Sequence, residues 1–251
     1  IIAITGQTKL AKQYGITNTL PIWDWVGGRY SFCSAVNLIL TIMIGKDAFT
    51  QLLNGAKTMD EHFKNAQYAS NIPVLLALLD IWNVNFFRAR SHLILTYCES
   101  LNYLPAFLQQ LAMESNGKST DNNQSLIPYS TAPIVWGGLG PQAEHAYYQL
   151  LQQGTHYNNI EYVFVKEECY KDINNLAYKK LVALTNGVGS ANPKQFKIAS
   201  NMIYLNKITP QTMGELIAMY EHRIYCQSVL WNINAFDQPG VDTAKKLGWE
   251  H

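Results

Sequence analysis

The stretch Leu-Ala-Met-Glu-Ser-Asn-Gly-Lys at residues 111–118 places one carboxylate, that of Glu114, at the end of an otherwise uncharged amphipathic run. Apolar residues recur before it at intervals of three and four, which predicts a helix over residues 101–113, and Ser-Asn-Gly then forms a stop signal. A helix C-terminus and apolar surroundings both disfavour the charged form of a carboxyl, and so raise its pKa toward that of a working general base. The alternative is an ordinary solvated glutamate at a helix end, and these eight residues alone favour that alternative.

Two glycines precede Arg29 in the stretch Val-Gly-Gly-Arg-Tyr-Ser, which leads into an apolar segment at residues 32–44 that we expect to be a helix ending at Gly45. A double glycine before an arginine at a helix start exposes backbone N–H groups and a guanidinium in one place. Such an arrangement suits the binding of an anion. A plain tight turn with a surface arginine is the alternative for so short a motif.

His145 follows a glycine-rich stretch, residues 137–140, which comes after a strand predicted over residues 132–136. We expect His145 to begin the next helix, where the positive end of the helix dipole disfavours a cationic imidazole and leaves a neutral ring that can accept or donate a proton. Capping of backbone amides by the ring is an alternative of equal weight. The glycine spacing is not GxGxxG, which argues against a dinucleotide site.

The elements that position these residues alternate between strands and helices. The predicted strands are residues 1–5, 92–97, 132–136, 161–166 and 202–208. The predicted helices are residues 8–14, 32–44, 47–63, 72–87, 101–113, 145–153 and 170–185, and a last long helix that Thr209 caps and Pro210 begins. We expect a loop at residues 186–192. This alternation predicts an α/β fold, a three-layer αβα sandwich around a mainly parallel sheet. In such sheets the ligand crevice lies beyond the carboxyl ends of the strands.

Residues 72–87 are the most apolar long segment, but Asp80, Asn83 and Asn85 interrupt it before it reaches the roughly 18 to 20 apolar residues of a membrane span. We therefore expect a core helix of a soluble protein. The chain opens on an apolar strand with no initiator methionine and no signal-peptide pattern. We expect it to begin inside a larger protein.

The 251 residues suffice for one large domain or two modest ones. A net charge of +1, from 19 Lys+Arg and 18 Asp+Glu, provides no basic excess for nucleic-acid phosphates. The cysteines are far apart and lack metal-ligand spacing, which predicts buried reduced thiols in a cytoplasmic protein; they are Cys33, Cys98, Cys169 and Cys226.

The remaining polar candidates lack the context that catalysis needs. Ser31 and Ser115 have no nucleophile-elbow motif around them, so a serine hydrolase is unsupported. Four histidines have no partner at helical spacing and no nearby cysteine, and we expect them to be solvated or satisfied in the core; they are His62, His92, His156 and His222.

Four stretches together resemble the glucose-6-phosphate isomerase family: residues 24–31 (DWVGGRYS), 113–118 (MESNGK), 133–155 and 220–240. The resemblance covers essentially the whole chain, and its first two motifs are long and unusual. It implies a sugar-isomerase (SIS-type) fold. The domains implied are the end of a first SIS domain at residues 1–45, a connecting helical segment at 46–75, and a second SIS domain with a C-terminal helix at 76–251.

In proteins of this family the glutamate of MESNGK moves a proton between C2 and C1 of the open-chain sugar phosphate, and the arginine of GGRYS stabilises the enediolate. The resemblance assigns these roles to Glu114 and Arg29. It assigns the opening and closing of the sugar ring to His145 and Lys245, and substrate contacts to Gly28, Gln110 and Gln238. The reaction implied interconverts glucose 6-phosphate and fructose 6-phosphate through a cis-enediol, in glycolysis and gluconeogenesis, without a cofactor or a metal.

The chain departs from the family pattern at residues 138–144, which read Gly-Leu-Gly-Pro-Gln-Ala-Glu, and at Pro239. We expect both departures in loops beside His145 and Lys245. Family members also carry an N-terminal half with a phosphate-binding loop, so this chain alone is expected to be inactive. The partner subunit contributes the family's histidine, which implies a homodimer in the cytoplasm, with no nucleic-acid or membrane partner. A non-catalytic sugar-phosphate-binding regulatory module is the alternative function; it would need the anion site but not the base.

Overall fold

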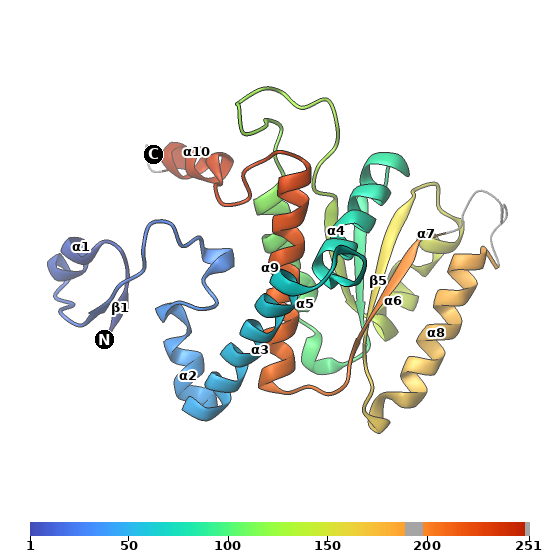
Figure 1. The fold of residues 1–251 in the computed structure, drawn as a ribbon, viewed down its shortest axis with the longest axis horizontal. Helices are drawn as coiled ribbons and strands as arrows, with labels where there is room; N and C mark the ends of the chain where they lie inside the picture. Colours follow the sequence, from blue (N-terminus) through green and yellow to red (C-terminus); the bar gives the residue numbers. More distant parts are fainter. Residues whose placement is uncertain (189–197, 249–251) are drawn as a thin grey trace.

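A four-stranded parallel sheet lies at the centre of the computed structural model, which describes residues 1–188 and 198–248 (Figure 1). Its strands follow the order β4-β3-β5-β6. Their bounds are β3 (Ser91–Thr96), β4 (Ile134–Leu139), β5 (Asn158–Val165) and β6 (Ser200–Leu205). Strand β5 is buried along its whole length because it has a strand on each edge and helices on each face. The predicted parallel sheet is confirmed.

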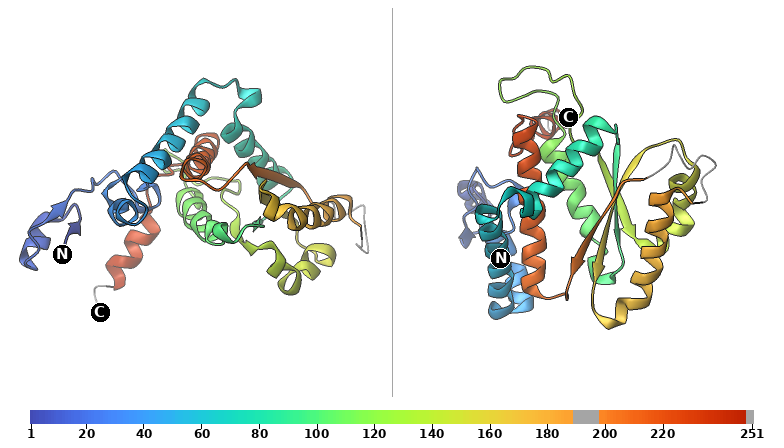
Figure 2. Two further views of the ribbon diagram at one scale, coloured as in Figure 1. Left: turned by 90° about the horizontal axis from the view of Figure 1, so that it is seen from below. Right: turned by 45° about the vertical axis from the view of Figure 1, so that its right-hand side comes forward.

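Helices cover both faces of this sheet (Figure 2). One face packs against α5 (Leu104–Gln109) and α9 (Pro210–Leu230), where Leu108 and Leu216 share a core cluster with Ile94 of β3. The opposite face packs against three helices, which are α6 (Gly140–Ala146), α7 (Tyr148–Gln153) and α8 (Lys171–Asn186). The three-layer αβα sandwich predicted from the sequence is therefore confirmed.

Helix α3 (Lys46–Asn65) crosses α9 at very short range because each helix supplies a glycine. A Cβ atom on Gly55 would lie 1.9 Å from the carbonyl oxygen of Gln211, and one on Gly214 would lie 1.9 Å from that of Leu52. No larger residue fits at either position without moving a helix. This crossing fastens α3, and α2 (Leu38–Ile44) before it, to the body of the molecule.

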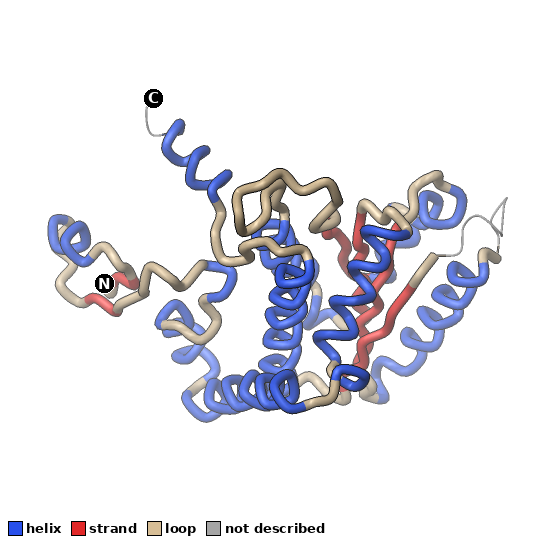
Figure 3. The backbone as a smooth tube through the Cα atoms, turned by 45° about the horizontal axis from the view of Figure 1, so that its top comes forward, coloured by secondary structure: helices blue, strands red, loops and turns tan. Residues whose placement is uncertain are grey.

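The first residues form a small unit of their own, in which β1 (Ala3–Ile4) pairs in parallel with β2 (Thr19–Leu20) around α1 (Thr8–Gln13). The predicted first strand and helix are confirmed. This unit stands to one side of the main body, and α10 (Pro239–Gly248) extends on the same side (Figure 3).

Three short helical turns connect the larger elements. They are η1 (Gly28–Tyr30), η2 (Ala35–Asn37) and η3 (Tyr68–Ser70). Turn η2 delays the helix predicted from residue 32, so that α2 begins only at Leu38. The side chain of Ser34 explains the delay, because it accepts a hydrogen bond from the Val36 amide and caps the turn.

Two predicted helices change their winding before they end. Residues 72–87 form α4 (Ile72–Ile81), which passes into the π-helical turn η4 (Trp82–Phe86). Residues 101–113 form η5 (Glu99–Leu101), α5 and the π-helical turn η6 (Gln110–Glu114). The expectation that residues 72–87 are a core helix is wrong for one face, because only a narrow stripe packs against α9 and the other apolar side chains are exposed, among them Leu75, Leu78, Leu79 and Trp82.

The region around residues 134–153 differs most from expectation. Strand β4 continues to Leu139 and includes Gly137 and Gly138. The neighbouring strand leaves no room for a side chain at Gly137, because a Cβ there would lie 1.9 Å from the carbonyl oxygen of Ile94. A helix then begins at once, with Pro141 in its first turn. The predicted loop at residues 138–144 is therefore wrong. The helix predicted at 145–153 is present but starts earlier, as α6, and is divided at Tyr147, where α7 follows.

Two further expectations have mixed outcomes. The four cysteines are free, but the predicted burial is confirmed only for Cys98. Cys226 is partly exposed, and Cys33 and Cys169 are exposed; Cys169 lies in the short turn η7 (Glu168–Tyr170). The predicted loop at residues 186–192 begins as expected, since Gly187 ends α8 with a left-handed φ of 70°. Residues 189–192 lie outside the described residues.

Candidate functional site

Arg29 is the centre of a hydrogen-bonded polar cluster. It lies in η1, and its side chain is buried. Its Nε donates to Ser115 Oγ (2.7 Å), its Nη1 to Gln238 Oε1 (2.9 Å), and its Nη2 to the carbonyl oxygens of Ala235 (2.7 Å) and Asp237 (3.1 Å). A guanidinium has five N–H donors, so these four bonds fix its plane and leave one N–H, on Nη1, outside them.

Glu114 faces that remaining donor. It is the last residue of η6, and its Oε1 lies 3.5 Å from Arg29 Nη1, while Gln110, one helical turn earlier, donates to its other oxygen (3.1 Å). The 3.5 Å separation is longer than a charge-assisted hydrogen bond. A ligand that lies beside the two groups would be within reach of a donor, Arg29, and a carboxylate, Glu114.

Lys118 completes the cluster through hydrogen bonds to backbone carbonyl oxygens. Its Nζ donates to the carbonyl oxygens of Glu114 (3.0 Å), Ser115 (2.6 Å) and Asp237 (2.9 Å), and it pairs with Asp237 Oδ1 at 3.3 Å. Burial lowers the pKa of this ammonium, and the Asp237 carboxylate opposes that effect. Lys118 and Arg29 thus join the loop at residues 234–238 to the end of η6.

Ser115 is fully buried between Arg29 and Tyr30, whose hydroxyl shares a 2.9 Å hydrogen bond with its Oγ. Burial raises the pKa of Tyr30, so its phenol stays protonated. Sequence reasoning did not assign a role to Lys118, Ser115 or Tyr30. The signal that could have identified them is their position inside the two motifs, GGRYS and MESNGK, that supply Arg29 and Glu114.

The cluster lies at the amino ends of the strands, so the expectation that the site lies beyond their carboxyl ends is wrong. The carbonyl oxygen of Asn116 accepts from the Ala132 amide (3.3 Å), two residues before β4 begins. The physical reason is the connection: α5 leaves the carboxyl end of β3 and runs back along the sheet, and Glu114 is at the end of this return path.

His145 does not join this cluster within one chain. It lies in the last turn of α6 and not at a helix N-terminus as expected. Helix α6 starts at the carboxyl end of β4, whereas Glu114 lies near the amino ends of the strands. Within the part of the chain that the structure describes, no hydrogen bond or ion pair joins His145, which is exposed, to Arg29 or Glu114.

The other assigned residues divide in the same way. Gln238 contacts Arg29 directly, and Gly28 begins the turn that carries Arg29. Lys245 lies on α10, which starts one residue after Gln238, but its side chain is outside what the structure describes. Pro239 is the first residue of α10 and not part of a loop, a position that suits proline because the N–H it lacks would have no helical partner.

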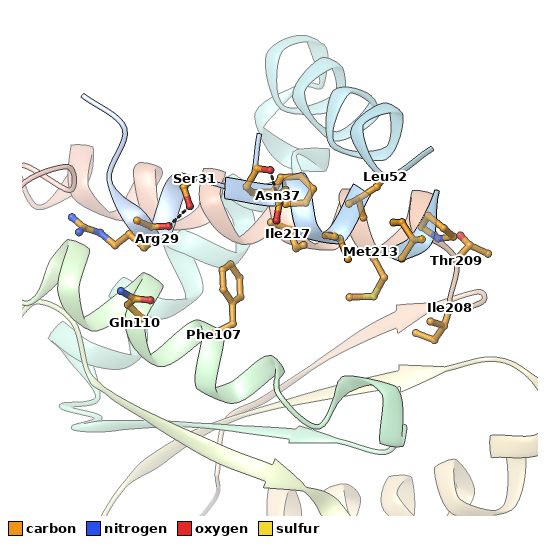
Figure 4. Close-up of a pocket in the computed structure, with 15 residues that line it drawn as sticks. Arg29, Ser31, Asn37, Leu52, Phe107, Gln110, Ile208, Thr209, Met213 and Ile217 are labelled. Carbon is orange, nitrogen blue, oxygen red and sulfur yellow. Dashed lines mark hydrogen bonds between the residues drawn. The ribbon is translucent and has the colours of Figure 1, made fainter. Parts of the chain in front are cut away.

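A hollow of about 570 Å³ adjoins the cluster (Figure 4). Gly28, Arg29 and Gln110 lie at its polar end, whereas Phe107 and Met213 belong to the apolar remainder of its wall. A charged ligand would therefore occupy only the end beside Arg29.

The predicted structural role agrees with the contacts of His62 and His222, whereas buried His92 is satisfied only in part, because its Nε2 has no hydrogen-bond partner among the described residues. His92 is buried 3.8 Å from Asp80, and burial lowers its pKa. His222 pairs with Asp60, and His62 accepts from the Ile72 amide. Residues 1–188 and 198–248 hold no group of three or more His, Cys, Asp or Glu side chains able to bind a metal, and no helix among them is long and apolar enough to cross a membrane.

Comparison with known families and proteins gives one consistent result. The family model described as phosphoglucose isomerase matches residues 1–189 and 190–250. A glucose-6-phosphate isomerase of Legionella pneumophila (strain Paris) is 49% identical over 248 residues, covering 97% of this chain and 50% of the relative. One from Shewanella pealeana is 42% identical over 277 residues, covering 98% and 51%. The chain thus spans about half the length of the curated relatives it matches.

Solved structures agree with this family match. The crystal structure of a glucose-6-phosphate isomerase from Chlamydia trachomatis superposes with a TM-score of 0.91 at 31% identity, covering 99% of this chain and 52% of that one. A hypothetical protein from Thermus thermophilus superposes with a TM-score of 0.78 at 23% identity, covering 99% and 62%. The second match is a likeness of fold alone.

Proposed function

The chain belongs to the phosphoglucose isomerase family, and we propose that it carries the proton-transfer half of an enzyme that interconverts glucose 6-phosphate and fructose 6-phosphate. The observation on which the proposal rests is the Glu114 carboxylate, held 3.5 Å from a buried guanidinium that is immobilised by four other hydrogen bonds. The relatives that are named glucose-6-phosphate isomerase supply the substrate class.

An aldose–ketose isomerisation moves one proton between adjacent carbons, so a single base that reaches both carbons is enough. Gln110 engages one oxygen of Glu114 and leaves the other, Oε1, toward Arg29. In our proposal Oε1 takes the proton from C2 of the open-chain aldose and returns it to C1. A well-placed general base contributes on the order of 10² to 10⁴ in rate.

The cis-enediol intermediate of this route forms as an enediolate, with negative charge on oxygen. In our proposal the uncommitted N–H of Arg29, which lies on the side of Glu114, donates to that oxygen. The guanidinium needs no reorganisation because its other donors are already bonded. Gly28 and Gln238 flank the guanidinium and would contact the sugar from its two sides.

We assign opening and closing of the sugar ring to His145 and Lys245. The position of His145 on the opposite side of the sheet from Glu114 supports a homodimer in which each copy supplies its histidine to the other's site. Lys245 lies on the helix that directly follows Gln238. The domains proposed are the end of a first SIS domain at residues 1–45, a connecting segment at 46–75 and a second SIS domain at 76–251, in a cytoplasmic enzyme of glycolysis and gluconeogenesis.

The test uses a chimaera in which residues 1–251 replace the matching half of the Legionella pneumophila relative. We expect this chimaera to turn over fructose 6-phosphate and the 251-residue chain alone to show no measurable turnover. Glu114→Gln should lower kcat of the chimaera by at least about 10²-fold, because the base is lost while the shape is kept.

Glu99→Gln is the matched control, because Glu99 is an exposed glutamate in the turn that precedes α5. It should leave kcat within about twofold of the unsubstituted chimaera, since it lies outside the site. Near-normal turnover of Glu114→Gln would refute the assignment of the base, and appreciable turnover by the isolated chain would refute its dependence on the remaining half.

A further inference from the structure

Three buried charges occupy the space between α4, β5 and α9. Arg223 donates to both carboxylate oxygens of Asp80, from Nε (2.6 Å) and Nη2 (2.7 Å), and its Nη1 donates to Glu161 Oε2 (2.6 Å). Tyr220 and Asn201 donate to the same Glu161 carboxylate. Burial alone would raise the pKa of Glu161, but the adjacent Arg223 guanidinium and the hydrogen bonds from these two donors lower it to about 2.

A line of side-chain amides runs from this ion triad toward the site. Gln227 donates from Nε2 to Asp80 Oδ2, and its Oε1 accepts from Asn116 Nδ2 (2.9 Å). The other Nδ2 hydrogen of Asn116 goes to the carbonyl oxygen of Ile224 (3.1 Å). The direction of the line is fixed by chemistry: a carboxylate only accepts hydrogen bonds, so Gln227 must turn its NH₂ to Asp80 and its oxygen to Asn116.

Asn116 is fully buried and lies two residues beyond Glu114, directly after the serine that accepts from Arg29 Nε. Asn116 lies just after the π-helical turn η6 and fixes its end. Such turns are rare and often occur at functional sites. If the turn relaxed to an α-helix, residues after it would shift by one position, a rotation of about 100° around the helix axis. Glu114 would then turn away from Arg29.

We propose that Gln227 is a positioning residue for Glu114: through Asn116 it ties the end of η6 to the Asp80–Arg223–Glu161 triad and so keeps the carboxylate aimed at Arg29. The inference deepens the proposed isomerase function and rests on it. Gln227 touches neither Glu114 nor Arg29 and acts only through this line of hydrogen bonds.

The substitution that tests this is Gln227→Met, which keeps the length of the side chain and removes both amide functions. Gln211→Met is the matched control, because Gln211 is exposed on the same helix and bonds only to Glu215 among the described side chains. Gln227→Glu is the second variant. It keeps an acceptor for Asn116 but presents a carboxyl to Asp80, with Arg223 and His92 behind it, and only its protonated form can donate to Asp80.

The first readout does not depend on catalysis. In the 251-residue chain, amide hydrogen exchange of residues 110–118 should become at least about tenfold faster in Gln227→Met and stay unchanged in Gln211→Met, since the fold remains while the local anchor is lost. Unchanged exchange in Gln227→Met would overturn the proposal. This result can be obtained even if the chimaera shows no turnover, an outcome that would count against the proposed function and not against the anchor.

The second readout is turnover of the chimaera per folded molecule, measured well below the unfolding temperature. Gln227→Met should lower kcat by about 10- to 100-fold and change KM by less than about threefold, because a misplaced base affects the chemical step. Gln227→Glu should retain most of its kcat relative to the unsubstituted chimaera at pH 6 and lose it as the pH rises to 9. A kcat within twofold for Gln227→Met, or a Gln227→Glu ratio that does not fall with pH, would overturn the proposal.

Discussion

Glu221 is a partly buried carboxyl on α9, and it shows how one residue makes stability depend on pH. Burial raises its pKa to about 7, and the charge of Asp60 adds to the effect. The unfolded chain has an ordinary glutamate pKa of about 4.5. Between these two values the folded state binds more protons than the unfolded state, so stability falls as pH rises from about 4.5 to about 7 and then levels off.

Glu221→Gln should remove that loss, since an amide stays neutral at every pH. Thermal unfolding at pH 5 and pH 8 measures it: the gain in Tm over the unsubstituted chain should be larger at pH 8. Glu99→Gln, at an exposed position, should give the same small change at both pH values. A Tm difference for Glu221→Gln that does not grow with pH would contradict this assignment.

Substitution of Arg29 by lysine tests whether catalysis needs the planar, forked guanidinium or only a positive charge. A lysine ammonium cannot hold Ser115, Gln238 and two backbone carbonyls in one plane. Arg29→Lys should therefore lower kcat of the chimaera by about 10²- to 10³-fold, the usual cost of losing an oxyanion donor. Arg90→Lys, at an exposed arginine, is the control, and equal activity of the two variants would argue against an oriented donor.

At the scale of elements, the sequence motifs anticipated the convergence of Glu114, Arg29, Gln110 and Gln238, since the structure brings all four together from three separate segments. The place of His145 was not anticipated, because Gly137 and Gly138 were interpreted as a turn. Both belong to β4, and at Gly137 the close backbone of β3 leaves no room for a side chain. Hydrophobic periodicity also cannot distinguish an α-helical turn from the π-helical turn η6, which decides where Glu114 points.

The crossing of α3 and α9 gives a prediction about packing. Gly55→Ala would place its Cβ against the Gln211 carbonyl and force the helices apart, which should cost about 1–3 kcal/mol or more of unfolding free energy in urea. Gly240→Ala on α10 meets no neighbour within 4 Å and should be neutral or slightly stabilising. Equal stability of the two variants would mean that the crossing tolerates a wider spacing.

At the scale of the whole molecule, the triad of Asp80, Glu161 and Arg223 joins α4 and α9 to strand β5 of the sheet. Its members are up to 143 residues apart in the chain, and no local pattern in the sequence relates them. Sequence reasoning treated Asp80 only as an interruption of an apolar helix. Long-range polar pairing of this kind becomes visible only when the layers are assembled.

Arg223→Met should be strongly destabilising, by about 3–5 kcal/mol, because it leaves two buried carboxylates without their cation. Lys171→Met breaks the exposed pair with Glu168 and should change stability little. Urea unfolding of both variants measures the contrast. A small effect of Arg223→Met would show that the carboxylates find other compensation, and it would weaken the case for the triad as an anchor.

The central claim, that Glu114 carries a proton between C2 and C1 beside Arg29, is tested most directly with glucose 6-phosphate that bears deuterium at C2. Turnover by the chimaera in ordinary water should yield fructose 6-phosphate with part of the deuterium at C1 and part lost to solvent, and Glu114→Gln should abolish both. Complete transfer with no loss to solvent would indicate a hydride shift. That result, or continued transfer in Glu114→Gln, would contradict the account.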